Sequence, residues 1–387
     1  MYLTILTLGA IGHVVLWVGL VNRAHGLGLG RQWVKVLTAL CCILFVAVPI
    51  AVGAAIGRQW TFPPADATAA VAWDYLSVCA IVCVVAGIQR WRWFLHQERR
   101  GAIISNHTAQ ISLPEAVAGP LTPPGISRWL SRLPGNQALQ LCLQEKQLAI
   151  PRLTPAYEGL RIVHISDLHM SGRISKAYFE RVVEAVNQCD ADLVAITGDL
   201  VEYDECLGWI PDTFGRLQAR DGIYYVLGNH DRRVRKDWLT AALTDAGLVH
   251  LGGIWRKITI RHTPVILAGN ELPWHRPAAD LRDCPGHDAR GLPLRIVLTH
   301  SPDQFGWAQA NDVDLLLAGH NHGGQVCFPL LGPIVAPSLN GVRYASGTFR
   351  AANTVLHVSR GTSSLTPLRW NCPPEIAVLN LRSASQS

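Results

Sequence analysis

The pattern of apolar and polar positions changes at about residue 100 and divides the chain into two parts. Residues 1–21 contain no Lys, Arg, Asp or Glu and are long enough to cross a bilayer as a helix. Similar apolar runs follow at 36–56 and 69–88, the last interrupted only by Asp74 near one end. We therefore predict an α-helical membrane region at 1–100 with about three transmembrane helices. A cleaved signal peptide is the alternative for the first run, although a basic amino-terminal region is missing.

Short apolar runs alternate with helix-like segments in the second part, which we place at residues 137–387. Five runs predict buried strands, at 161–165, 193–196, 223–227, 296–298 and 315–318. Helical apolar spacing lies between them at 176–189 and at 236–246, the second closed by Gly247. This alternation predicts an α/β fold.

The segment between the two parts, residues 101–136, is predicted to be a proline-rich linker. Its prolines at 114, 120, 123, 124 and 134 argue against one continuous element. Residues 126–133 are expected to form either a short amphipathic turn on lipid or an ordinary surface helix, and the sequence leaves both open.

Basic residues beside the apolar runs predict the orientation in the membrane. The loop between the first two runs and the segment after the third are basic, whereas only Arg58 lies between the second and third. The basic residues are Arg23, Arg31 and Lys35 in the first group, and Arg90, Arg92, Arg99 and Arg100 in the second. The positive-inside rule then places the amino terminus outside and residues 137–387 in the cytoplasm.

Net charge and cysteine content narrow the possible partners. The formal net charge of +6 suits an anionic membrane surface or a phosphate-bearing substrate. We find no repeat, zinc finger or aromatic-basic RNA motif, so no nucleic-acid partner is expected. The ten cysteines lack a metal-like C-x-x-C spacing and are expected to be reduced thiols, as in a cytoplasmic domain.

Metal-binding side chains follow each of the five predicted strands. In chain order they are Asp167 and His169, then Asp199, then Asn229, His230 and Asp231, then His300, and finally His320 and His322. Ligands at the carboxyl ends of strands in an α/β sheet converge at one edge. Carboxylate, amide and imidazole ligands without thiolate suit Mn, Fe or Zn better than Ca. We predict two divalent ions, manganese favoured, roughly 3.5–4 Å apart, that activate a water for attack on phosphorus.

These motifs resemble those of the calcineurin-like metallophosphoesterases, whose pattern is Asp-x-His, Gly-Asp, Gly-Asn-His-Asp/Glu, His and Gly-His-x-His. The resemblance covers about residues 137–382. It implies a sandwich of two mixed β-sheets flanked by helices, with late strands at 354–358 and 376–381. The chain would thus be a metal-dependent hydrolase of phosphoester or pyrophosphate bonds.

The resemblance also implies a role for each motif residue. One metal would be held by Asp167, His169 and His322, the other by Asn229, His300 and His320, with Asp199 as the bridge. His230 would be the general acid or transition-state stabiliser beside the leaving group. Asp231 would orient His230 and tune its pKa.

Three segments near the carboxyl terminus resemble those of the membrane-associated bacterial branch of this family. They are Gly323-Gly-Gln325, Val358-Ser-Arg-Gly361 and Asn371-Cys-Pro-Pro-Glu375. Some members of this branch hydrolyse the pyrophosphate of UDP-2,3-diacylglucosamine. We therefore expect a multi-pass protein of the bacterial plasma (inner) membrane that contacts membrane lipids and cleaves a lipid-linked substrate. Hydrolysis of soluble nucleotides or phosphoproteins, and a non-catalytic metal-binding membrane sensor, remain alternatives. The loop at 270–292, which opens with Asn270-Glu271, has no transferable interpretation.

Overall fold

A computed structural model describes residues 2–57, 66–100, 102–111, 121–288 and 291–384, without side-chain detail at 93–100. Three residues used in the predictions above lie outside the described residues, namely Arg58, Pro114 and Pro120. The side chains of Arg99 and Arg100 are likewise not described. The chain divides into two compact units. One comprises Met1–Arg99 with Pro337–Arg343, and the other comprises Arg100–Ala336 with Tyr344–Ser387.

The first unit contains the helices α1 (Tyr2–Gly26), α2 (Arg31–Gly57) and α3 (Ala67–Arg100). Each of the three is long and apolar enough to cross a membrane, which confirms the predicted helical region. A side chain at Gly12 of α1 would lie 1.7 Å from the carbonyl oxygen of Cys79 in α3, so the helices meet closely at a residue without Cβ. His13 ties the three together, because its ring nitrogens lie 2.6 Å from the Tyr75 hydroxyl and 3.0 Å from the Phe45 carbonyl oxygen.

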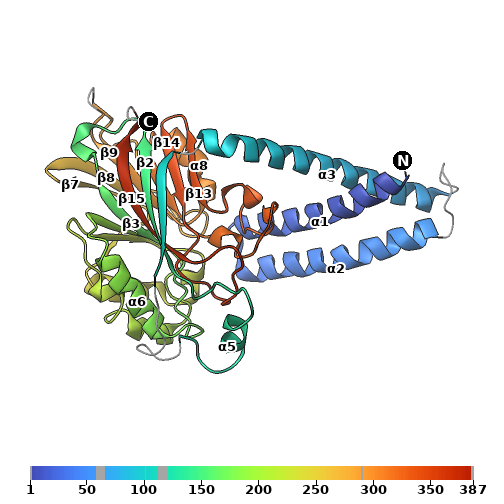
Figure 1. Ribbon diagram of the computed structural model, residues 1–387, viewed down its shortest axis with the longest axis horizontal. Helices are drawn as coiled ribbons and strands as arrows, with labels where there is room; N and C mark the ends of the chain where they lie inside the picture. Colours follow the sequence, from blue (N-terminus) through green and yellow to red (C-terminus); the bar gives the residue numbers. More distant parts are fainter. Residues whose placement is uncertain (1, 58–65, 101, 112–120, 289–290, 385–387) are drawn as a thin grey trace. The chain divides into compact units, whose positions relative to one another are not determined.

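The second unit is built on two mixed β-sheets (Figure 1). The seven-stranded sheet has the order β1 (Ile103–Gln110), β2 (Cys142–Ile150), β15 (Glu375–Ser383), β3 (Arg161–Ile165), β4 (Leu193–Thr197), β5 (Ile223–Val226) and β6 (Val249–His250). The six-stranded sheet has the order β13 (Gly347–Ala351), β14 (Thr354–Val358), β10 (Leu315–Ala318), β9 (Leu294–Thr299), β8 (Thr263–Asn270) and β7 (Trp255–Ile260). A separate hairpin pairs β11 (Cys327–Phe328) with β12 (Gly332–Pro333). Strands β3 to β6 are parallel, as are β14, β10, β9 and β8.

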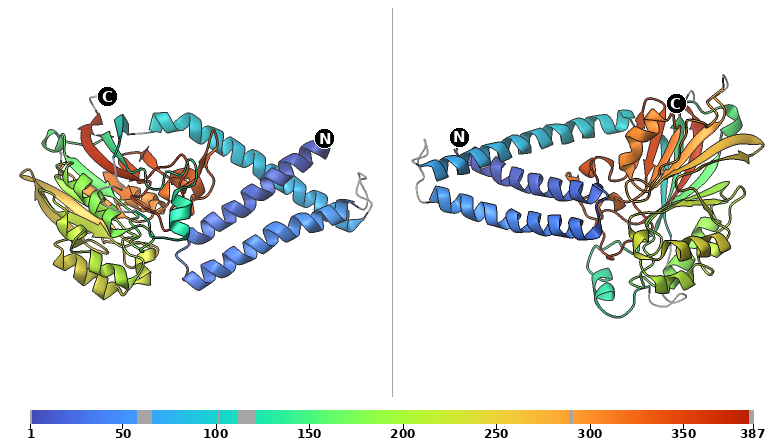
Figure 2. Two further views of the ribbon diagram at one scale, coloured as in Figure 1. Left: turned by 60° about the horizontal axis from the view of Figure 1, so that its bottom comes forward. Right: turned by 180° about the vertical axis from the view of Figure 1, so that it is seen from behind.

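Alternating side chains of the strands fill two apolar layers. Ile162 of β3 packs between the sheets, in the same layer as Leu298 of β9 and Leu317 of β10. On the outer face, Val163 and Ile165 pack in a layer with helix α6 (Lys176–Asn187), and helix α7 (Lys236–Asp245) contributes to that layer as well. Helix α8 (Phe305–Ala310) lies beside β14, and Figure 2 shows the layers from two further sides. The predicted sandwich of mixed sheets flanked by helices is confirmed.

The predicted linker differs from the structure at its beginning. Residues 103–110 form β1 and pair antiparallel with β2, from Ile103 opposite Leu148 to Gln110 opposite Cys142. The second unit therefore begins near Arg100 and not near residue 137. The sequence hid this strand because most of its side chains are polar and exposed, as an edge strand tolerates. Residues 126–131 form the short helix α5 (Ile126–Ser131).

Candidate metal centre

The ends of five parallel strands carry the side chains that the sequence singled out. Asp167 and His169 follow β3, Asp199 follows β4, Asn229 follows β5, His300 follows β9, and His320 and His322 follow β10. Both sheets therefore contribute to the site. Six of the seven are buried, which removes them from bulk water and leaves their polar atoms facing one another.

A first group of ligand atoms lies at the ends of β3, β4 and β10. The carboxylate and imidazole atoms of Asp167, His169, Asp199 and His322 all lie within 4.8 Å of one another. His322 Nε2 is 2.9 Å from His169 Nε2 and 3.4 Å from Asp167 Oδ1. Two carboxylates and two imidazoles at this spacing form a suitable set of ligands for one divalent ion.

A second group shares Asp199 with the first. Atoms of Asp199, His300 and His320 also lie within 4.8 Å of one another. Asn229 Oδ1 is 3.1 Å from His300 Nε2, which adds an amide oxygen to this group. Asp199 Oδ2 lies 3.5 Å from His169 Nε2 and 3.3 Å from His300 Nε2. The carboxylate of Asp199 is thus positioned to bridge two ions.

Hydrogen bonds on the far side of the histidine rings determine which nitrogen can bind a metal. His300 Nδ1 lies 2.7 Å from the carbonyl oxygen of Thr197, which only accepts, so this Nδ1 carries the proton and donates. The lone pair of His300 is then on Nε2, the atom that faces the cluster. His322 Nδ1 lies 3.2 Å from the carbonyl oxygen of Ser363 and 3.1 Å from Arg369 Nη2, which only donates, so these contacts are compatible with either tautomer of His322. The arrangement at His300 is typical of metal-ligating histidines, and the ligand types of both groups fit a pair of divalent ions.

The backbone at the ligands adopts a conformation that side chains other than glycine rarely take. The φ angles of Asp167, His169, Asp199, His320 and His322 lie between 48° and 71°. Each such residue costs of order 1–3 kcal/mol, and such residues concentrate at functional sites. The sharp turns at the strand ends allow the next side chains to converge, so the fold accepts local strain to build this cluster.

The electrostatics of the two aspartates call for bound positive charge. Burial raises the pKa of the Asp167 carboxyl, and the charge of Asp199 raises it further against the opposing effect of His300. Burial also disfavours ionisation of Asp199, but His300 and His230 outweigh it and hold its pKa well below the usual range. Two buried carboxylates that disfavour each other's ionisation are an environment in which a divalent cation is strongly stabilised.

Glu202 is a functional residue that the sequence analysis missed. Its buried Oε1 lies 2.5 Å from His169 Nδ1 and 2.5 Å from His230 Nδ1, and its Oε2 accepts from Arg233. Burial opposes its ionisation, yet the hydrogen bonds from His169 and His230 lower the pKa of Glu202 to about 2. The carboxylate therefore accepts from both rings and links a metal ligand to His230. The signal in the sequence that could have identified Glu202 is its position, three residues after Asp199.

Known proteins share this set of motifs. A family model described as calcineurin-like phosphoesterase matches residues 160–324. Phosphodiesterase YaeI of Escherichia coli (strain K12) is 31% identical over 229 residues, which cover 57% of this chain and 82% of that protein. The chain belongs to the calcineurin-like phosphoesterase family. It is therefore a metal-dependent hydrolase of phosphoesters.

Two further relatives of this phosphoesterase differ in how much of the chain they cover. An uncharacterized metallophosphoesterase, YkuE of Bacillus subtilis (strain 168), is 29% identical over 243 residues, covering 59% of this chain and 81% of that protein. A transmembrane protein with metallophosphoesterase domain from Bos taurus is 27% identical over 329 residues, covering 80% of this chain and 72% of that protein. The match to the bovine protein thus covers more of the chain than residues 160–324, which contain the metal-binding motifs. We refer to the second unit, which carries these motifs, as the catalytic unit.

The role predicted for Asp231 in this phosphoesterase needs correction. Its carboxylate accepts four backbone N–H groups, from Asp199 at 2.9 Å, Leu200 at 2.8 Å, Val201 at 3.1 Å and Gly228 at 2.7 Å. The Nδ1 atom of His230 instead meets Glu202. Asp231 holds the two ligand-bearing turns together, and Glu202 takes the orienting role that the sequence assigned to Asp231. Sequence spacing favoured the adjacent residue because it cannot show the direction of a side chain.

The loop at 270–292 contributes an aromatic wall to the site of the phosphoesterase. The ring of Trp274 lies 4.6 Å from that of His320 and 5.4 Å from that of His300, measured between centroids. Its neighbour Glu271 accepts the backbone N–H of Leu227 at 2.6 Å and contacts His250 Nε2 at 2.7 Å, so Glu271 stabilises the loop.

The arginines that follow the Asn-His-Asp motif have separate partners. Arg233 pairs with Glu202 at the site, whereas Arg235 lies 3.5 Å from Asp204 and stacks on Trp238. Arg232 is exposed. Among these arginines, Arg233 is thus the one that contacts Glu202.

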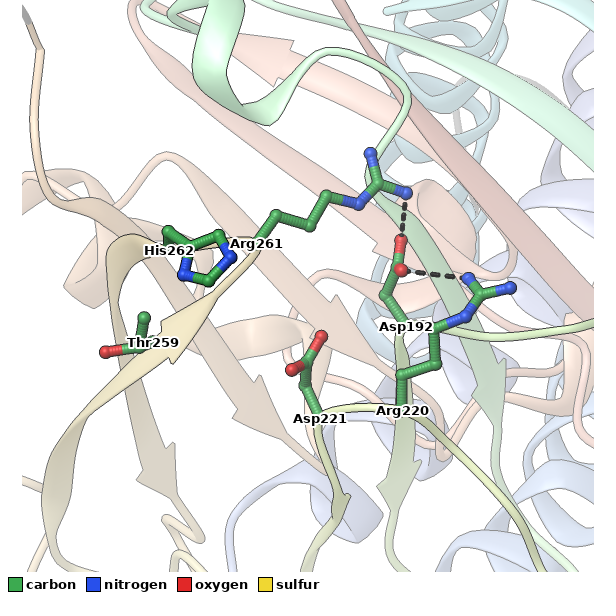
Figure 3. Close-up of a pocket in the computed structure, with 6 residues that line it drawn as sticks. All are labelled: Asp192, Arg220, Asp221, Thr259, Arg261 and His262. Carbon is green, nitrogen blue, oxygen red and sulfur yellow. Dashed lines mark hydrogen bonds and ion pairs between the residues drawn. The ribbon is translucent and has the colours of Figure 1, made fainter.

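A separate pocket lies at the opposite, amino-terminal ends of β4 and β5 (Figure 3). Its arginines are already paired, since Arg220 and Arg261 both contact the buried carboxylate of Asp192. This pocket is remote in the fold from the strand ends that carry the metal ligands, and its ion pairs join the start of β4 to Arg220 and to the turn between β7 and β8.

Proposed function

We propose that this phosphoesterase is a multi-pass membrane enzyme that cleaves a phosphodiester or pyrophosphate bond of a lipid-linked substrate. The observation that carries the hydrolytic part is Asp199, whose one carboxylate joins the ligand groups of His169 and His300. The three apolar helices support the membrane part. A bacterial inner membrane with the catalytic unit on its cytoplasmic side fits the distribution of basic residues.

The chemistry divides between the bound ions and this chain's own side chains. Two divalent ions, for which we favour manganese over iron or zinc, would polarise the phosphoryl group and supply a nucleophilic water at neutral pH. Asp167, His169 and His322 would hold one ion and Asn229, His300 and His320 the other, with Asp199 shared.

His230 would act on the leaving group. About 20% of its side chain is exposed, whereas Glu202 behind it is fully buried. With Nδ1 donating to Glu202, the opposite nitrogen Nε2 is the atom available to the substrate. As an imidazolium, His230 would donate from Nε2 to the departing oxygen, and the Glu202 carboxylate would stabilise the charge. Trp274 would form an apolar boundary of the same site.

Confinement to the membrane supports a lipid-linked substrate. An enzyme and a substrate held at one surface meet at a higher effective concentration than two solutes do. Among such substrates, UDP-2,3-diacylglucosamine is our leading candidate, because its pyrophosphate joins a soluble nucleotide to an acylated sugar.

The test uses the full chain in phospholipid nanodiscs with manganese. Two substrates are compared, UDP-2,3-diacylglucosamine and a soluble aryl phosphodiester, with Asp199→Ala as the inactive control. The proposal predicts release of UMP from the lipid, and its loss in the variant. Cleavage of the aryl diester alone would retain the hydrolase and favour soluble nucleotides or phosphoproteins as substrates. Bound manganese without turnover of either would favour a metal-binding sensor.

A further inference from the structure

The hairpin β11–β12 presents an apolar tip directly after the metal-ligand loop. Phe328 is 49% exposed, Leu330 is 104% exposed and Leu331 is 61% exposed. Residues 326–337 contain no charged side chain. Single exposed apolar residues are ordinary on protein surfaces, but a contiguous exposed group of this kind marks an interaction site.

The backbone at the tip strengthens this interpretation. Leu330 has a φ of 65°, in the left-handed region where glycine or asparagine is usual. The backbone N–H of Leu331 donates to the carbonyl oxygen of Pro329 at 2.8 Å, which closes a tight turn around Leu330. In water, a leucine here combines an unfavourable backbone conformation with an exposed apolar side chain. An apolar environment around the tip would remove the second cost.

The stem of the hairpin is fixed to the catalytic unit. Cys327 donates its backbone N–H to the carbonyl oxygen of Trp370 at 2.9 Å, and Asn371 Nδ2 donates to the carbonyl oxygen of Cys327 at 3.0 Å. A Cβ on Gly324 would lie 2.4 Å from Pro333 Cβ, so the stem packs tightly on the turn that follows His322. The tip is joined to the ligand His322 by at most about 28 Å of extended chain.

The chain supplies an argument for a lipid bilayer as the partner. The part of α3 that is long and apolar enough to cross a membrane ends at Arg92, the helix itself ends at Arg100, and β1 of the catalytic unit begins at Ile103. The catalytic unit is therefore tethered by a short stretch of chain to any bilayer that α3 crosses. The helix α5 adds Ile126 and Trp129, which are 74% and 62% exposed, and tryptophan is enriched at membrane interfaces.

We propose that the tip of the β11–β12 hairpin inserts into the bilayer and sets the metal centre at the lipid surface. The insertion itself does not depend on which phosphoester is cleaved. Its consequence for catalysis rests on the proposed function: a phosphoester carried by a lipid headgroup would reach the centre without leaving the membrane, while a soluble phosphoester would gain nothing.

The direct test is photocrosslinking of the full chain in nanodiscs that contain a phospholipid with a photoactivatable acyl chain. After irradiation and digestion, mass spectrometry locates the lipid adducts. We expect adducts on residues 327–335 as well as on α1, α2 and α3. The peptide with Ile254, an apolar residue that is 41% exposed outside the hairpin, is the internal control and should carry none. Adducts confined to the three helices would overturn the proposal.

A variant with Leu330→Asp and Leu331→Asp changes the tip of the hairpin and leaves the metal-binding residues unchanged. Ile254→Asp is the matched control. Adducts on the hairpin should fall to the level of the Ile254 peptide. The KM for a lipid-borne phosphoester should rise, while kcat and KM for a soluble aryl diester stay unchanged and report intact folding. Equal effects on both substrates, or none on adducts, would contradict the insertion. Failure of the unmodified chain to cleave the lipid substrate would remove only the proposed function, because the crosslinks are measured independently.

Discussion

The imidazole of His230 and the carboxylate of Glu202 are joined by a 2.5 Å hydrogen bond between Nδ1 and Oε1, and the same oxygen meets the metal ligand His169. One buried carboxylate therefore orients both His230, which we propose acts on the leaving group, and a residue of the metal cluster. Mutations at Glu202 should affect two properties that can be measured separately.

Replacement Glu202→Gln should slow the reaction by about 10–100-fold, the usual effect of losing a partner behind a metal ligand. If His230 donates a proton, the loss should be larger for an alkyl phosphodiester than for a p-nitrophenyl diester, because p-nitrophenolate leaves without protonation. The measurement is kcat/KM for both diesters at saturating manganese. Glu205→Gln, at an exposed position, is the control. An equal loss on both diesters would show that Glu202 acts through His169 alone.

The strand ends and their ligands could be predicted from the sequence because the motifs are local. Strand β3 ends at Ile165, so Asp167 and His169 follow directly at the edge of the sheet. Asp199 follows β4 in the same way. Glu202, Ser363 and Trp274 could not be placed, because their roles depend on side-chain directions and on loops distant in sequence. The strand β1 was missed for another reason, since its stability comes from pairing with β2 and its own residues are polar.

Replacement Asp231→Asn should destabilise the fold more than it changes catalytic chemistry. The amide nitrogen would face two backbone N–H groups that now donate to a carboxylate oxygen, at a cost of about 1–3 kcal/mol for each unpaired donor. The midpoint of thermal unfolding should fall, whereas Asp237→Asn at an exposed position should leave it unchanged. A variant with the wild-type midpoint but altered leaving-group dependence would restore the role first predicted for Asp231.

Replacement Gly319→Ala should displace Asp167. An added Cβ would lie 1.9 Å from Ser166 Oγ and 2.5 Å from Asp167 Oδ2. We expect about one bound manganese fewer per chain and a loss of activity of about 100-fold, the scale set by misplacement of a catalytic group. Gly208→Ala, where the added atom meets open space, is the control. Metal analysis of the purified chain decides, and an unchanged manganese content would refute the assignment of Asp167.

A buried chain of hydrogen bonds should make the catalytic unit sensitive to acid. Lys146 Nζ lies 3.0 Å from His357 Nε2, His357 Nδ1 lies 2.9 Å from His164 Nδ1, and His164 Nε2 lies 2.8 Å from Thr197 Oγ1. Because the Lys146 ammonium can only donate, His357 and His164 must each accept on one nitrogen and stay neutral. Burial lowers the pKa of His164 to about 3, and the charge of Lys146 acts in the same direction against that of Glu375.

The sign of the effect follows from the unfolded chain, where a histidine has a pKa of about 6.5 and binds the proton that folded His164 refuses. Stability from His164 is therefore present above about pH 6.5 and is lost as the pH falls toward 3, by about 1.4 kcal/mol per pH unit. Thermal unfolding between pH 7 and pH 4 should show a shallower decline in His164→Gln than in the unmodified chain or in the exposed control His107→Gln. Parallel declines in all three would contradict this account.

A carboxylate of Asp199 shared by two metal ions would join both sites into one hydrolytic centre. The most direct measurement is a manganese titration by calorimetry of the full chain and of Asp199→Ala, together with turnover of a soluble aryl phosphodiester. Asp212→Ala, whose side chain is 59% exposed, serves as the matched control. We expect two ions per chain with turnover in the unmodified chain and the control, and weakened binding at both sites without turnover in Asp199→Ala. Two ions bound with unchanged affinity and undiminished turnover in Asp199→Ala would exclude a shared role for this carboxylate.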